Sequence, residues 1–145
     1  MACFANFQVF GKLIFVSKNY AEAFERFDFG LSTSNTSSVF RSMYSNKALA
    51  VGANSSISLS SDNGLNWTSR TLSGFNNANF NAAILQDANK GFIIGDTGLV
   101  LTSIDGGLNW NKIDNANKEN LVSMSKKPNN GIYAVGKKGV IMKIQ

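Results

Sequence analysis

The chain contains no histidine, one cysteine (Cys3) and one proline (Pro128). Without histidine it cannot form a Ser-His or Cys-His relay or a zinc site that includes histidine. A single cysteine excludes an intramolecular disulfide framework. No apolar run approaches the ~20 residues that span a bilayer, and the first ten residues lack a basic segment. We therefore expect no membrane span and no signal peptide. The composition favours a virion or cytoplasmic location over secretion.

Charged residues are also scarce, at 16% of the 145 residues, while 43% are hydrophobic, which is typical of a folded domain with a core. The net charge is +5, and the cations are eleven lysines but only three arginines. Recognition of bases and phosphates relies mainly on arginine, so a nucleic-acid partner is disfavoured. Five lysines near the C-terminus form a candidate patch for an anionic partner, although a solvated face is the simpler interpretation. They are Lys126, Lys127, Lys137, Lys138 and Lys143.

Two segments of the chain align without a gap at a spacing of 43 residues. One extends from Val51 to Trp67 and the other from Ile94 to Trp110. The octapeptides that end them share six residues: Ser60, Asp62, Gly64, Leu65, Asn66 and Trp67 recur as Ser103, Asp105, Gly107, Leu108, Asn109 and Trp110. A weaker copy ends at Phe24, and the residues at 132–142 repeat the pattern at 92–101. The sequence is therefore a tandem repeat.

Each repeat unit has the pattern of β structure. Short apolar runs that end in glycine, at 91–94 and 132–135, predict buried strands. The glycine spacing at 95–98 and 136–139 predicts turns between strands. A short helix at about 20–27 competes with a strand there, and the repeat register favours the strand. About four strands in ~43 residues is the make-up of a propeller blade.

The sequence therefore predicts an all-β fold, a β-propeller-like array of about 3.5 four-stranded blades. We expect a single domain over residues 1–145, with units at approximately 1–30, 38–73, 80–114 and 121–145. A closed propeller needs at least four blades. The array either closes as a small ring completed by the N-terminus, pools its blades with other chains in an oligomer, or stays open and stacks on a partner.

The motif Ser-x-Asp-x-Gly-x-Asn-Trp resembles the Asp-box, or BNR repeat, of β-propellers. Together with the glycine-rich run before it, the unit is similar to the repeats of YCF48-like photosystem II assembly factors, over about 45–145 and more weakly over 5–30. The resemblance implies that the box residues are structural: Ser60, Asp62, Gly64, Trp67, Ser103, Asp105, Gly107 and Trp110. The chemistry agrees, because aspartate accepts backbone N–H bonds in its own turn and an indole can pack between blades.

These features favour a non-enzymatic protein-interaction or structural module without cofactor or metal. We expect a subunit of a larger assembly, such as a virion component or an assembly factor, whose partners are other proteins or further copies of itself. A glycan-binding, lectin-like propeller is the first alternative. A sialidase-like glycosidase fragment is the second, and it is disfavoured because sialidase-type propellers need six blades, more than this length holds.

Overall fold

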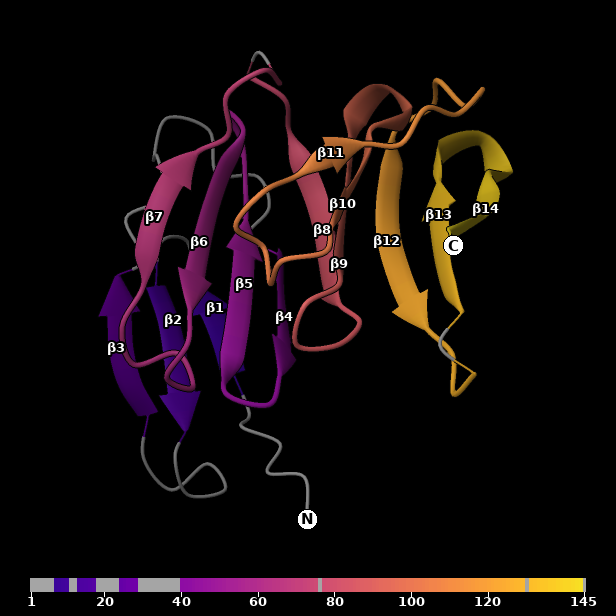
Figure 1. The fold of residues 1–145 in the computed structure, drawn as a ribbon. Coiled ribbons are helices and arrows are strands. Elements are labelled where there is room, and N and C mark those ends of the chain that lie inside the picture. The colour runs from indigo at the N-terminus through magenta and orange to yellow at the C-terminus, as the bar shows by residue number, and fades with distance from the viewer. Residues whose placement is uncertain are drawn as a thin grey trace.

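A computed structural model describes residues 7–10, 13–17, 24–28, 40–75, 77–129 and 131–144, with side chains from residue 44 onward. The described strands form four sheets of three, four, four and three strands. In each sheet the strands follow one another as an antiparallel meander, and the sheets succeed one another along the chain (Figure 1). The predicted all-β, propeller-like array is thereby confirmed. Of the residues described, none belongs to a helix with the length and apolar character needed to cross a membrane.

The first sheet consists of β1 (Phe7–Phe10), β2 (Leu13–Ser17) and β3 (Phe24–Asp28). The second consists of β4 (Phe40–Tyr44), β5 (Lys47–Val51), β6 (Ser56–Ser60) and β7 (Thr68–Thr71). The third consists of β8 (Phe80–Leu85), β9 (Gly91–Gly95), β10 (Val100–Ser103) and β11 (Asn111–Lys112). The fourth consists of β12 (Leu121–Lys126), β13 (Ile132–Gly136) and β14 (Ile141–Ile144). Two one-turn 3-10 segments, η1 (Asp96–Gly98) and η2 (Lys137–Gly139), join β9 to β10 and β13 to β14.

Strand register shows the repeat directly. The pairs Val16↔Glu25, Leu59↔Thr68 and Thr102↔Asn111 follow one another at the 43-residue spacing in both of their strands. The strands β2 and β3 therefore correspond to the third and fourth strands of a complete blade, and β12–β14 correspond to the first three. The end sheets are partial blades, and among the described strands no ladder joins the fourth sheet to the first.

The competing helix at 20–27 is not present in its described part. Strand β3 begins at Phe24, as the repeat register favours, and residues 20–23 lie outside the described residues. The predicted turn at 95–98 forms as η1. Thr97 and Gly98 both have positive φ, at 55° and 73°, and the Leu99 N–H bonds to the Asp96 carbonyl at 3.1 Å. This is the type I′ geometry that suits the twist of a hairpin.

The core lies between sheets. One cluster of buried side chains joins the second and third sheets through Val51, Ile57 and Phe80, and a second joins the third and fourth through Ile94 and Leu121. The first strands of these sheets are neighbours, because β8 contacts β4 on one side and β12 on the other. The meander places both octapeptide loops at one end of the sheets, here called the box end, and η1 and η2 at the opposite end (Figure 1).

Candidate interaction groove

The first octapeptide loop is organised around the Asp62 carboxylate. Its Oδ1 accepts hydrogen bonds from Ser60 Oγ at 2.7 Å and from the backbone N–H groups of Asn66 and Leu65 at 2.9 and 3.1 Å. Its Oδ2 accepts a bond from Asn66 Nδ2 at 2.6 Å. Aspartate suits this position because its short side chain reaches backbone donors within the same turn.

The second loop repeats this geometry. Asp105 Oδ1 accepts bonds from Ser103 Oγ at 2.8 Å and from the Asn109 N–H at 2.9 Å, and its Oδ2 accepts a bond from Asn109 Nδ2 at 2.7 Å. The Ser103 hydroxyl also accepts the Gly107 N–H at 2.9 Å. The Trp110 indole N–H donates to the Gly107 carbonyl at 2.9 Å. The serine, aspartate, asparagine and tryptophan side chains of the motif thus each bond within their own loop.

These bonds stabilise the charged form of both aspartates. Hydrogen bonds from the backbone and side chain of Asn66 lower the pKa of Asp62 to about 2. Those from Asn109 lower the pKa of Asp105 to about 2. Both carboxylates are therefore anionic at neutral pH, where a general acid would have to carry a proton. No group of three or more cysteine, aspartate or glutamate residues gathers anywhere in the described part of the chain.

The second loop also packs on the preceding sheet. Trp110 is 8% exposed and belongs to the cluster between the second and third sheets, whereas Trp67 is half-buried. Gly107 has a φ of 90°, and a Cβ built there would lie 2.9 Å from Leu59 Cδ2 of β6. Glycine is favoured at this position for its backbone angle.

A groove of about 330 Å³ lies where the second loop meets β5, β6 and β7. Two cations line it. Arg70 donates from Nη2 to the Gly107 carbonyl at 2.9 Å and also to that of Leu108, and Lys47 Nζ donates to the Ala88 carbonyl at 2.8 Å. The groove is lined by Lys47, Leu59, Ser60, Ser61, Thr68, Arg70, Asp105, Gly106 and Leu108.

The groove presents donors and apolar surface together. The described bonds of Arg70 use one nitrogen of its guanidinium, which carries five N–H donors in all. Leu108 beside it is 58% exposed. An exposed arginine beside an exposed leucine suits a segment with both a carboxylate and an apolar side chain. Sequence reasoning did not select Lys47 or Arg70, because neither belongs to a motif.

The five C-terminal lysines are not brought together. Lys126 ends β12 at the box end and Lys127 follows it, and Lys143 lies opposite Tyr133 in the β13–β14 ladder. The remaining two, Lys137 and Lys138, are in η2 at the opposite end, because β13 runs the length of the sheet between the groups. Lys126 Nζ donates to the Gln86 carbonyl at 2.6 Å, and Lys127 Nζ lies 4.6 Å from the centroid of the Tyr133 ring.

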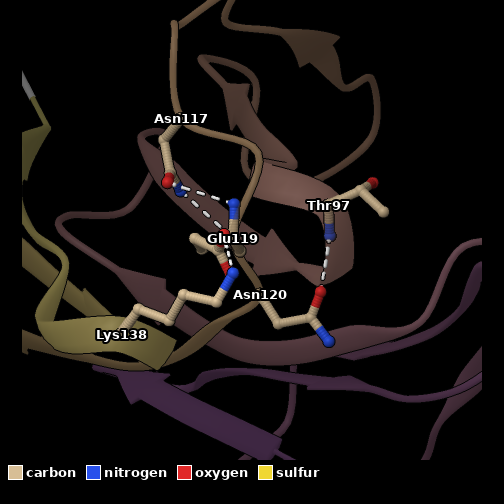
Figure 2. Close-up of polar contacts among 5 residues, drawn as sticks. All are labelled: Thr97, Asn117, Glu119, Asn120 and Lys138. Carbon is tan, nitrogen blue, oxygen red and sulfur yellow. Dashed lines mark hydrogen bonds and ion pairs between the residues drawn. The ribbon is translucent and has the colours of Figure 1, made fainter.

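The opposite end of the sheets is closed by a polar network between the third and fourth sheets (Figure 2). The Thr97 N–H donates to Asn120 Oδ1 at 2.9 Å, and Lys138 Nζ pairs with Glu119 Oε1 at 2.9 Å. The Glu119 N–H donates to Asn117 Oδ1 at 3.1 Å, and Asn117 Nδ2 donates to the Glu119 carbonyl at 3.0 Å. These groups satisfy one another, whereas the groove lined by Lys47 and Arg70 lies at the box end, which is therefore the candidate for ligand binding.

Comparison with known proteins identifies relatives that match the repeat region of the chain. The family profile described as photosynthesis system II assembly factor YCF48 matches residues 17–142. A solved structure of YCF48 bound to a D1 peptide is similar to the chain, with a TM-score of 0.73 and 16% identity over 92% of this chain and 44% of that one. The structure of YCF48 from Cyanidioschyzon merolae is similar with a TM-score of 0.73 and 14% identity, over 93% and 45%.

This chain therefore spans less than half the length of those two relatives. At such identities the structural likeness shows the fold. A search of curated protein sequences finds no match.

Proposed function

Because the chain belongs to the photosynthesis system II assembly factor YCF48 family, we propose that it is a non-enzymatic module that binds a peptide segment of a partner protein during assembly of a larger complex. The family supports the assembly role, and the relative bound to a D1 peptide supports a peptide as the ligand. The observation that carries the proposal in this chain is the groove between the second and third sheets, with Lys47 and Arg70 on its walls.

The groove suits a short segment rather than a folded surface, because it is small, at about 330 Å³. An anionic side chain or terminal carboxylate of the peptide pairs with Arg70, whose planar fork matches a carboxylate. An adjacent apolar side chain packs on Leu108, and Lys47 adds a second cation at the same end. The affinity comes from a few contacts, as expected of a transient assembly factor.

The octapeptide loops have a supporting role in this proposal. Asp105 and Ser103 hold the loop whose carbonyls bind Arg70 and whose Leu108 lines the groove. Asp62 and Ser60 hold the conformation of the first loop through the equivalent bond. We also propose that residues 1–145 form one propeller domain. A virion location remains a prediction from composition, and no feature of the described residues favours a glycan over a peptide.

Fluorescence anisotropy with a labelled D1 peptide tests the proposal. We expect saturable binding by the chain and about 10-fold weaker binding by Lys47→Gln or Arg70→Gln, because each loses a charge-assisted contact. Lys137→Gln, in η2 at the opposite end, removes the same charge without touching the groove and is the matched control. Absence of saturable binding, or equal weakening by Lys47→Gln and Lys137→Gln, would contradict the proposal.

A further inference from the structure

One cross-strand pair recurs at the same place in three sheets. It joins the end of the second strand of a blade to the start of the third, and it is Val51↔Ile57 in the second sheet and Ile94↔Val100 in the third. Both pairs are buried, with at most 1% of any of the four side chains exposed. The two residues of a pair point to the same face of their sheet.

The next sheet of the chain covers each of these pairs. Val51 and Ile57 share a buried cluster with Phe80 of β8, Ile93 of β9 and Leu101 of β10. The other pair, in the third sheet, shares a cluster with Leu121, Ile132 and Ala134 of β12 and β13. This face of a blade is therefore the surface on which the next blade packs.

The corresponding pair in the fourth sheet is Val135↔Ile141. Val135 is 42% exposed and Ile141 is 75% exposed. Tyr133 and Lys143, the next pair on the same face, border them. A position that is fully buried in two blades is thus open in the third, and none of the described strands lies on it.

We propose that this outer face of the fourth sheet docks the first sheet, β1–β3, of a second copy of the chain. The first sheet is a partial blade by its register, since Val16↔Glu25 repeats the pairing of the later sheets. Its strands β1 and β2 correspond to β9 and β10, which supply part of the cover for the second sheet. The contact between copies therefore continues the contact between blades within the chain.

The length of the relatives indicates how many copies take part. The aligned 92% of this chain equals 44% of the YCF48 chain bound to a D1 peptide, so two copies supply close to the length of one relative. Two identical head-to-tail contacts close a ring with twofold symmetry, which leaves no open face to propagate. The proposal concerns self-association, and it does not depend on peptide binding in the groove.

Light scattering after size-exclusion chromatography of the 145-residue chain tests the proposal. We expect a mass of twice 15.7 kDa, and a mass of 15.7 kDa for Ile141→Lys, which places a charge in the contact. Ile104→Lys is the matched control, because Ile104 is 74% exposed but lies in the loop after β10. This variant should keep the double mass.

A mass of 15.7 kDa for the unmodified chain at its highest soluble concentration overturns the proposal. The outer face of the fourth sheet would then be a binding surface for a different protein or a further blade. Double mass retained by Ile141→Lys, or lost equally in Ile104→Lys, also overturns it. Circular dichroism should show the same folded spectrum for all three proteins. If Ile141→Lys does not fold, Val135→Thr replaces it as the smaller change. We then expect the measured mass of Val135→Thr to fall below the double mass at low protein concentration, where the unmodified chain keeps it. If the two proteins have the same mass there, the proposal is overturned.

Discussion

The backbone N–H of Thr97 donates a hydrogen bond to the side-chain Oδ1 of Asn120, with 2.9 Å between nitrogen and oxygen (Figure 2). The main-chain carbonyl of Asn120 accepts the N–H of Lys137 at 2.9 Å. One residue in the connecting loop thus binds η1 of the third sheet and η2 of the fourth. The relative position of these two blades is set by this contact as well as by the buried cluster between them.

Replacement of Asn120 by alanine should weaken the chain slightly. It removes the side-chain acceptor of Thr97 but leaves the main-chain bond to Lys137, and water can reach the exposed Thr97. We expect a loss of about 0.5–1 kcal/mol in the free energy of unfolding by urea. Asn111→Ala, at an exposed site in β11, is the control. An unfolding midpoint for Asn120→Ala equal to that of wild type would show that the contact contributes nothing.

Two glycines with the same backbone geometry should differ sharply when replaced by alanine. Gly98 and Gly139 have φ values of 73° and 75° in equivalent turns. A Cβ at Gly98 would lie 2.0 Å from the Asn117 carbonyl oxygen, whereas one at Gly139 meets nothing within 4 Å. We expect Gly139→Ala to cost about 1 kcal/mol and Gly98→Ala at least about 3 kcal/mol. Equal losses in chemical denaturation would mean that the loop moves aside freely.

The box serine gives a test of the loop's internal bonding. Ser103 is fully buried and its hydroxyl links the Gly107 N–H to Asp105. Ser103→Ala leaves a buried N–H without its partner, so we expect a loss of about 1–3 kcal/mol by thermal or urea unfolding. Ser61→Ala, at an exposed site in the other loop, should change stability little. Indistinguishable unfolding of the two variants would argue against the proposed structural role of the motif.

Stability should fall in acid within a defined window. The pKa values of Asp62 and Asp105 drop from 3.8 to about 2 on folding, so the unfolded chain binds protons first as pH decreases. The stabilisation is therefore complete above about pH 5 and is lost as pH falls from about 4 to about 2. Asp105→Asn should unfold at a lower temperature than wild type at pH 7, and the difference should shrink toward pH 2. A difference that stays constant with pH would show that these carboxylates are not the source.

Local sequence was sufficient for the blades and not for the groove. The turn at Asp105 and the positive φ of Gly107 follow from chemistry within one loop, so a repeated octapeptide predicts them. The groove depends on Arg70 meeting the second octapeptide loop at Gly107, and on Lys47 meeting the β8–β9 connection at Ala88. Each partner lies about forty residues further along the chain and is brought close by stacking between sheets. No spacing in the sequence encodes that meeting.

The lysines near the C-terminus also show that closeness in sequence does not predict closeness in the fold. Lys126 and Lys137 are close in sequence but lie at opposite ends of the fourth sheet, because a strand separates them. The exposure of Ile141 was also beyond sequence reasoning, since its counterparts Ile57 and Val100 are buried. The same sequence pattern is therefore buried in the two middle blades and exposed in the last one, where no following sheet of the described residues covers it.

The location of peptide binding is the most direct test of the central claim. Backbone amide shifts of the isotope-labelled chain would be followed by NMR during titration with the D1 peptide. The account predicts that the shifts change at Lys47, Arg70 and Gly106 to Leu108, around the groove. Changes confined to η1 and η2 at the opposite end, or no changes at saturating peptide, would contradict it.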